Sequence, residues 1–258
     1  MMKRIIPILL LKDKLLYKTI NFDMPKYIGD PFVALKIFND KEVDELIVLD
    51  IDKSKKKKAP DTDFLESLAS EAFMPVGYGG GITTVDQARE IFNIGFEKVI
   101  LNSILNSDLN LIKEISKIFG SQAVVASVDY KMKYFTKKRF CVFKNGKISS
   151  QLCPKELAIS CERAGAGEIL LHCVSYEGKM DKMDVDFIKE VVEEIDIPVI
   201  GSGGAPNSSY ITEFFLKTHA SALAAGSIFI YYGKYNAVLI NYPSYEDKKN
   251  ILDKIEKI

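Results

Sequence analysis

The chain has 258 residues, a formal net charge of zero and a hydrophobic share of 47%. This length suits one α/β barrel better than two domains, and the composition is typical of a protein with a sizeable core. A balanced charge gives no indication of nucleic-acid binding, and no stretch reaches the roughly 18 uninterrupted apolar residues of a membrane-spanning helix. We therefore expect one domain over residues 1–258, with no nucleic-acid or membrane partner.

The chain has four cysteines and two histidines, and no two cysteines have the CxxC spacing of a zinc cluster. Reduced thiols in a cytoplasmic protein are the default interpretation of such a pattern. We expect no metal and no cofactor.

Short apolar runs alternate along the chain with amphipathic helical patterns. The predicted strands are Ile5–Leu11, Leu46–Ile51, Met74–Tyr78, Lys98–Asn102, Ala123–Asp129, Glu168–Cys173, Pro198–Ser202 and Ser221–Ala225. The predicted helices between them are Phe32–Asn39, Phe64–Phe73, Val85–Asn93, Leu109–Phe119, Lys155–Ala164, Val185–Ile195 and Tyr210–Lys217. Strands that are apolar on both faces indicate a parallel sheet covered by helices. Eight such units in this length predict a single (β/α)₈ TIM barrel, in the α/β class.

Three segments depart from this rhythm. Tyr130–Ser150 is aromatic and basic and contains the turn signal Lys144-Asn145-Gly146-Lys147, so we expect a β-hairpin inserted after the fifth barrel strand. The tail Ser244–Ile258 has the pattern of a final helix. The run Lys55–Lys58 is interpreted as a solvated loop that at most raises the positive potential near an anion site.

The strand ends repeat between the two halves of the chain. Tyr78–Ile82, with three glycines, recurs as Gly201–Ala205, and Leu101–Ile104 recurs as Ala225–Ile228. Matched strand ends in the same order are what a duplicated half-barrel would leave.

Glycine pairs and hydroxyl residues at these strand ends predict phosphate sites. Glycines let backbone N–H groups approach a phosphate, and the N-terminus of the following helix adds positive partial charge. Tight turns alone would also need glycines, but paired motifs on adjacent strands favour binding, and two such sites suggest a ligand with a phosphate at each end. The candidates are Gly80, Gly81, Asn102 and Ser103 after strands three and four, Gly203, Gly204, Gly226 and Ser227 after strands seven and eight, and Gly178 in the loop after strand six.

Three polar side chains end buried strands, where they would point into the barrel mouth. Asp129 ends strand five and is a candidate general acid or base, with a helix cap or a solvated strand end as the alternative. Asp50 ends strand two with the same geometry and is a weaker candidate for a general acid or base. His172 ends strand six and could titrate near neutral pH, although a lone histidine is more often a structural hydrogen-bonding group.

Charged residues begin several of the strands. Arg4 begins strand one, Glu45 precedes strand two, and Glu97 and Lys98 begin strand four. Such charges at the bottom of a barrel usually form a stabilising layer of salt bridges. A ring of them around the axis could equally gate a passage through the barrel.

Several runs match one known family. The most specific are Phe119–Val125 and Gly165–Leu171, and the others are Lys3–Ile6, Asn21–Phe22, Gly29–Pro31, Asp44–Leu46, Gly79–Ile82 and Ser202–Ala205. On these residues the chain resembles, over essentially its whole length, the HisF-type cyclase subunit of imidazole glycerol phosphate synthase. The resemblance implies a ribulose-phosphate-binding barrel that acts on a two-phosphate ribonucleotide. It also implies a HisH-like glutaminase partner, which docks on the N-terminal face and delivers ammonia through the barrel.

The resemblance also assigns roles to individual residues. The gate of the family corresponds to Arg4, Glu45 and Lys98, with Glu97 where an aspartate is usual. Its second catalytic aspartate corresponds to Asp129, and the lysine of its mobile loop after strand one to Lys18. Its phosphate-binding positions correspond to Gly81, Asn102, Ser103, Gly178, Gly204 and Ser227.

The chain departs from the family at the first catalytic aspartate. The family closes strand one with Cys-Leu-Asp-Val, whereas this chain has Ile8-Leu9-Leu10-Leu11, so Leu10 replaces the carboxylate. Leucine cannot transfer a proton, and loss of a positioned acid or base typically costs about 10²–10⁴-fold in rate. The loop Cys173–Lys179 also differs from the Asp-Arg-Asp-Gly-Thr pattern of the family, and His172 replaces a threonine that contacts substrate.

Three functions remain open at this point. The first is a diverged synthase subunit that adds ammonia to another phosphate-bearing acceptor, with Asp129 and His172 handling protons. For this function the resemblance alone suggests a pathway, namely the amidination of acetamido sugars of bacterial surface polysaccharides, which similar paralogues accompany. The second is a genuine cyclase of histidine biosynthesis in which another group replaces the missing aspartate. The third is an inactive scaffold that activates the glutaminase.

Overall fold

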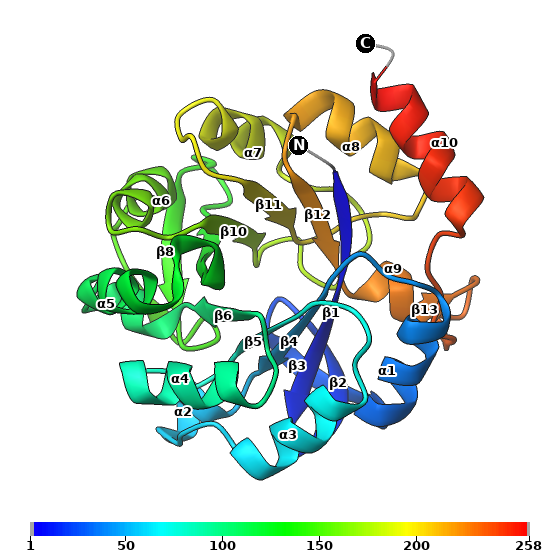
Figure 1. Cartoon of the computed structure of the whole chain (residues 1–258). Helices are drawn as coiled ribbons and strands as arrows, with labels where there is room; N and C mark the ends of the chain where they lie inside the picture. The colour runs from blue at the N-terminus through cyan, green and yellow to red at the C-terminus, as the bar shows by residue number, and fades with distance from the viewer. Residues whose placement is uncertain (1–2, 257–258) are drawn as a thin grey trace.

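The computed structural model describes residues 3–256, which form a closed barrel of eight parallel strands (Figure 1). In order around the barrel these are β1 (Arg4–Lys12), β4 (Leu46–Asp50), β5 (Val76–Gly79), β6 (Lys98–Leu101), β7 (Val124–Met132), β10 (Glu168–Cys173), β11 (Val199–Ser202) and β12 (Ala222–Ala225). β12 pairs with β1, with Arg4 opposite Ala222, and this pairing closes the sheet. The predicted (β/α)₈ barrel is confirmed.

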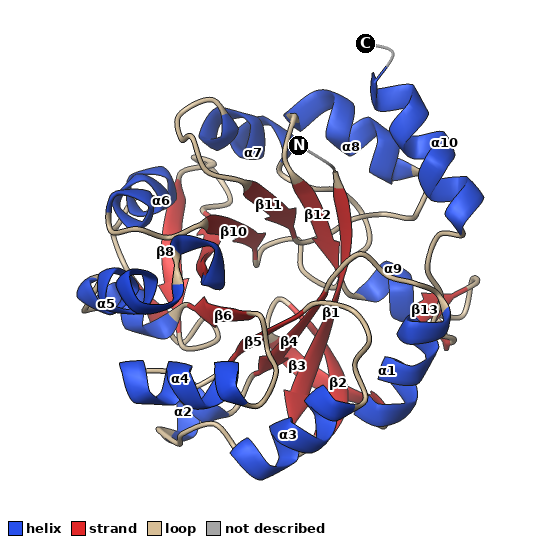
Figure 2. Ribbon diagram, viewed as in Figure 1, coloured by secondary structure: helices blue, strands red, loops and turns tan. Residues whose placement is uncertain are grey.

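Helices cover the outside of the barrel (Figure 2). Several helices have a side-chain cap at the N-terminus. Asp30 caps α1, and Thr84 and Gln87 form a capping box at the start of α4. The helices are α1 (Pro31–Asp40), α3 (Thr62–Ser70), α4 (Val85–Asn93), α5 (Asn110–Phe119), α6 (Pro154–Arg163), α7 (Val185–Val192), α8 (Tyr210–Thr218) and α10 (Tyr245–Glu256). The sequence predicted the last helix to Ile258, but residues 257 and 258 lie outside the described part of the chain.

The buried core has two layers. The outer layer lies between the strands and the helices and contains large side chains such as Phe38, Tyr78 and Phe214. The inner layer lines the barrel axis with aliphatic side chains, namely Ile6, Ile8, Leu10, Ile47, Ile100, Val125, Leu170, Ile200, Ala222 and Ala224. The axis is therefore apolar between the two ends of the barrel.

A strand pair follows β1 where the sequence predicted no strand. β2 (Leu15–Ile20) pairs antiparallel with the end of β1, and β3 (Asp23–Gly29) pairs with β2. Lys18 therefore lies in a strand, and its side chain is buried. The connection after strand one, to which the resemblance assigns this lysine, is thus a strand pair in this structure.

A second antiparallel extension lies at the end of β7. β7 pairs with β8 (Arg139–Phe143), and β8 pairs with β9 (Ile148–Ser149). The side-chain amide of Asn145, in the turn between β8 and β9, donates a hydrogen bond to the carbonyl oxygen of Ile51. This contact holds the turn against the carboxyl end of β4.

Short elements complete the rim of the barrel. They are α2 (Lys53–Lys56), the 3₁₀ turns Ser103–Asn106 and Ser121–Ala123, α9 (Ser227–Ile230), and the paired strands β13 (Tyr231–Tyr232) and β14 (Ala237–Val238). Within residues 3–256, no helix combines the length and the apolar character needed to cross a membrane.

Candidate active site at the mouth of the barrel

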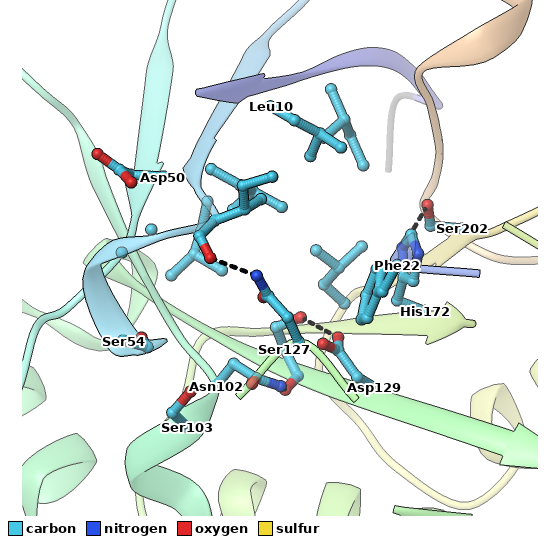
Figure 3. Close-up of a pocket in the computed structure, with 18 of the residues that line it drawn as sticks. Leu10, Phe22, Asp50, Ser54, Asn102, Ser103, Ser127, Asp129, His172 and Ser202 are labelled. Atoms are coloured by element: carbon cyan, nitrogen blue, oxygen red, sulfur yellow. Dashed lines mark hydrogen bonds between the residues drawn. The ribbon is translucent and has the colours of Figure 1, made fainter. Parts of the chain in front are cut away.

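A cavity of about 440 Å³ opens where the barrel strands end (Figure 3). Every residue that the sequence suggested for catalysis, phosphate binding or other substrate contact lines this one cavity. These residues are Lys18, Asp50, Gly80, Gly81, Asn102, Ser103, Asp129, His172, Gly178, Gly203, Gly204, Gly226 and Ser227. The structure thus brings together side chains from strands and loops that span more than 200 positions of the sequence.

The glycine turns on the two sides of the cavity are built alike. Gly81, after β5, has a φ of +72°, and Gly204, after β11, has a φ of +91°, a region that L side chains rarely adopt. A Cβ on Gly81 would collide with the carbonyl oxygen of Lys58, and a Cβ on Gly204 would collide with that of Lys182. Both positions therefore need glycine, and both glycines line the cavity.

A serine begins a short helical turn on each side of the cavity. Ser103 starts the 3₁₀ turn after β6, and Ser227 starts α9 after β12. The side-chain amide of Asn102 donates a 2.9 Å hydrogen bond to the carbonyl oxygen of Ser127, which fixes its orientation next to Ser103. The two serines and the neighbouring glycine turns form matching rims that suit oxyanions.

Asp129 is the acidic side chain at the centre of the site. It lies on β7 with 9% of its surface exposed, and the Ser127 hydroxyl donates a 3.0 Å hydrogen bond to its Oδ1 atom. Burial raises the pKa of Asp129 to about 7, and the hydrogen bond from Ser127 opposes this shift. A carboxyl group with this pKa can both accept and donate a proton near neutral pH.

His172 is held in a neutral form beside Asp129. Its ring stacks on Phe22 with 5.2 Å between ring centroids, and its Nδ1 atom lies 3.1 Å from the Ser202 hydroxyl. Burial lowers the pKa of His172 to about 3, and the positive charge of Lys18 adds to this effect. The imidazole therefore does not titrate near neutral pH, contrary to the sequence-based suggestion. Its Nε2 atom is buried without a hydrogen-bond partner among the described residues, so it is free to bind a ligand.

Lys18 and Glu177 form a buried pair of opposite charges between the β2–β3 pair and the loop after β10. Glu177 accepts hydrogen bonds of 3.1 Å from the Thr19 hydroxyl and from the backbone N–H of Phe22. Burial lowers the pKa of Lys18 and raises that of Glu177, and the attraction between the two charges opposes both shifts. The ammonium group of Lys18 occupies the space that a Cβ on Gly226 would need. From the sequence, Glu177-Gly178 was expected at most to supply an amide to a phosphate, and this pairing of the Glu177 carboxylate was not predicted.

Asp50 lies on the opposite side of the cavity from His172 (Figure 3). It accepts a hydrogen bond of 3.1 Å from the backbone N–H of Asp52, and its Oδ2 atom lies 4.0 Å from Nζ of Lys53. Burial raises the pKa of Asp50, and the contacts with Asp52 and Lys53 oppose the shift.

Four charged side chains meet at the other end of the barrel. The guanidinium of Arg4 contacts the carboxylate of Glu45 and lies 2.9 Å from that of Glu168. The ammonium of Lys98 lies 2.8 Å from Glu45 and 3.2 Å from Glu168. The two cations and two anions alternate in a closed cluster at the start of the strands.

Glu97 is not part of this four-residue cluster, so its assignment to the gate is wrong for this structure. Its carboxylate accepts a 2.7 Å hydrogen bond from the backbone N–H of Val76, and the residue is exposed. Glu168 takes the fourth place, and the sequence offered a signal for it. This glutamate begins an otherwise apolar strand, as Arg4 and Lys98 do, and so belongs to the same end of the barrel.

Within residues 3–256, no three His, Cys, Asp or Glu side chains come together in a way that could hold a metal ion. The cavity instead offers backbone amides, hydroxyl groups and lysines, which are ligands for anions.

Residues 4–236 match the family model described as "Histidine biosynthesis protein". The chain belongs to this family. A Pseudomonas aeruginosa protein named "Putative imidazole glycerol phosphate synthase subunit hisF2" is 44% identical over 241 residues, which cover 93% of this chain and 96% of that protein. A Vibrio vulnificus protein named "Putative imidazole glycerol phosphate synthase subunit hisF3" is 40% identical, and the match covers 97% of this chain and 96% of that protein. A Petrotoga mobilis protein named "Imidazole glycerol phosphate synthase subunit HisF" is 37% identical over 91% and 92% of the two chains.

In this member of the histidine biosynthesis family, the cavity that holds Asp129 has an apolar wall. Leu10, on β1, is 5% exposed and lines the cavity together with Ile8, Leu49 and Leu170. Figure 3 shows Leu10 and Asp129 projecting toward the same cavity from different strands. The side chain that faces Asp129 across this space is therefore aliphatic.

Proposed function

We propose that this HisF-type chain is the synthase subunit of a glutamine amidotransferase and adds ammonia to a phosphate-bearing acceptor at the barrel mouth. The observation that carries the proposal is the placement of Asp129, a buried acid with a pKa of about 7, at one end of an apolar axis. The alternating charges of Arg4, Glu45, Lys98 and Glu168 lie at the other end.

Ammonia would enter through the charged cluster from a HisH-like glutaminase bound to the N-terminal face. An aliphatic axis penalises an ammonium ion because the ion would lose its hydration without gaining a partner. Nitrogen would therefore arrive as neutral ammonia, which is the nucleophilic form. One side chain of the cluster has to turn aside to open the way.

At the mouth, the rim near Ser103 would hold the acceptor through its phosphate, and the rim near Ser227 would form hydrogen bonds with its other end. As the nitrogen lone pair forms a bond to the carbonyl carbon of the acceptor, the C=O π bond breaks and its electron pair moves to the oxygen. The carboxylate of Asp129 accepts a proton from the nitrogen and passes it to the oxygen. With a second proton from the nitrogen the oxygen leaves as water, so that a C=N bond replaces the C=O bond. The neutral His172 would donate or accept one hydrogen bond through Nε2 and so orient the acceptor. Lys18 would neutralise negative charge beside Gly226.

We further propose that the acceptor differs from the ribonucleotide of the family cyclase. Leu10 occupies the place that the resemblance gives to a catalytic carboxylate, so Asp129 lacks the partner acid from β1 that the cyclase reaction would use. An acetamido sugar destined for a bacterial surface polysaccharide is the acceptor class that the resemblance suggests, in a cytoplasmic reaction.

The test is glutamine-dependent turnover of the full chain together with its HisH-like glutaminase. We expect the ribonucleotide of the cyclase reaction to turn over at least about 10²-fold more slowly than with a two-carboxylate HisF, since one positioned acid or base is missing. We expect Leu10→Asp to restore part of that rate. Normal turnover by the unaltered chain would instead identify a genuine cyclase.

The Asp129→Asn variant separates catalysis from scaffolding. We expect it to abolish product formation from the true acceptor while glutaminase stimulation stays unchanged. If neither the unaltered chain nor the variant formed product and both stimulated the glutaminase equally, the chain would be a scaffold that only activates its partner.

A further inference from the structure

Positive charge is concentrated on one side of the cavity. Lys53, Lys57 and Lys58 follow β4, Lys144 comes from the turn between β8 and β9, and all four line the cavity. Asp50 is the acidic residue that lines this side, and it is paired with Lys53 at 4.0 Å. The ion pairs found among residues 3–256 do not include Lys57, Lys58 or Lys144.

Two contacts fix these lysines next to the rim of β5 and β6. The segment that carries Lys53 and Lys58 packs against Gly81 so closely that a Cβ there would collide with both residues. The hydrogen bond from Asn145 to the carbonyl oxygen of Ile51 brings the Lys144 turn to the same place. Figure 3 shows Asp50 and Ser54, from this segment, on one side of the cavity, with His172 and Ser202 on the other.

The rim of β11 and β12 has no such excess. Lys18 is the lysine that lines the cavity there, and the carboxylate of Glu177 offsets its charge. His172 adds no charge because its ring is neutral. The backbone amides near Gly204 and the hydroxyl of Ser227 remain as uncharged polar groups.

From this asymmetry we infer that the ligand of the cavity carries a diphosphate at its β5–β6 end and no net negative charge at its β11–β12 end. A lysine ammonium binds phosphate as a point charge, and several lysines around one group suit an anion that carries more than one negative charge. A bisphosphate would place its second dianion against a rim whose charges already balance. The inference rests on the proposed function in taking this cavity as the acceptor site.

The test is isothermal titration of the full chain with inorganic pyrophosphate and with orthophosphate at matched ionic strength. We expect pyrophosphate to bind at least about tenfold more tightly, because it can engage more of the lysines at once. The double variant Lys57→Asn, Lys58→Ala should lose at least about tenfold in pyrophosphate affinity. Asparagine replaces Lys57 because this residue has a φ of +53°, which asparagine tolerates.

A control variant locates the effect. Lys55→Ala removes a lysine of the same segment that does not line the cavity, and we expect pyrophosphate affinity to stay within about twofold.

Three results would overturn the inference. These are equal affinity for the two anions, full retention of pyrophosphate affinity in the double variant, and an equally large loss in Lys55→Ala. If the chain failed to transfer ammonia but still bound pyrophosphate through these lysines, only the proposed function would be contradicted. Normal ammonia transfer without preference for pyrophosphate would contradict this inference alone.

Discussion

The hydroxyl of Ser127 donates a 3.0 Å hydrogen bond to the carboxylate of Asp129, two residues further along β7. Alternate residues of a strand point to the same face, so the two-residue spacing places both side chains on the face of β7 that lines the cavity. One hydrogen bond orients the carboxyl group, but it does not compensate for burial, and the pKa of Asp129 is still raised to about 7. The site therefore contains a fixed group that is half ionised near neutral pH.

This pKa predicts the pH dependence of the reaction. At a fixed concentration of free ammonia, the rate should rise with pH and level off above about 7, because the Asp129 carboxylate is the form that accepts a proton. His172→Gln should keep this rise, since the His172 ring is already neutral throughout that range. A pH–rate profile of each variant checks both points, and an unchanged rise in Asp129→Asn would show that another group titrates.

The same shift predicts a gain in stability for Asp129→Asn above neutral pH. The folded state holds a proton on Asp129 up to about pH 7 and the unfolded chain only to about pH 4, so stability falls as pH rises between these values. Asparagine removes this penalty, which is on the order of 3–4 kcal/mol at pH 8 and near zero at pH 4. Urea unfolding at the two pH values measures the difference. The exposed Asp40→Asn is the matched control, and an equal gain there would contradict the explanation.

Breaking the charged cluster should destabilise the barrel. In Lys98→Met, both Glu45 and Glu168 lose a partner at a nearly buried site, and we expect a loss of about 3 kcal/mol in the free energy of unfolding. Lys217→Met is the control, because its pair with Glu213 is exposed and should be worth less than about 1 kcal/mol. Similar values for the two variants in chemical denaturation would mean that the cluster contributes little to stability.

Glu177 should decide how firmly the β2–β3 pair covers the cavity. Its carboxylate accepts hydrogen bonds from the Thr19 hydroxyl and the Phe22 amide, and Glu177→Ala would leave both donors and Lys18 without this partner. We expect faster hydrogen exchange at the Phe22 amide in this variant, measured by NMR or mass spectrometry. Glu177→Gln keeps an acceptor oxygen and should restore part of the protection. Unchanged exchange in the alanine variant would show that other contacts hold the strands.

The barrel could be predicted from the sequence because its strands are apolar on both faces and are separated by amphipathic helices. The β2–β3 pair could not, and Pro25 illustrates the reason. A proline within a run argues against a strand unless the strand lies at a sheet edge or at an irregularity. Both exceptions hold here, because β3 pairs with β2 alone and the register shifts between Lys18 and Ile20.

The site was predictable where it depends on strand ends and not where it depends on side-chain direction. Gly81, Ser103, Asp129 and Ser227 follow or end barrel strands, so topology alone brings them together. Glu97 and Lys98 are adjacent in the sequence, and the pleat of the strand determines that only Lys98 points to the axis. The charge asymmetry of the cavity could be predicted only in part. The run Lys55–Lys58 indicated at most a positive potential near an anion site, and Lys144 joins the Lys53–Lys58 segment only through tertiary contacts.

The cluster at the start of the strands has a consequence for transport through the barrel. Arg4 and Glu168 are 164 positions apart, and together with Glu45 and Lys98 they tie strands on different sides of the axis. The side chains at the proposed entrance for ammonia are thus also cross-braces of the fold. The proposed passage would therefore need a brief swing of one side chain while the other three stay joined, and a permanently open variant would lose heat resistance as it gained permeability.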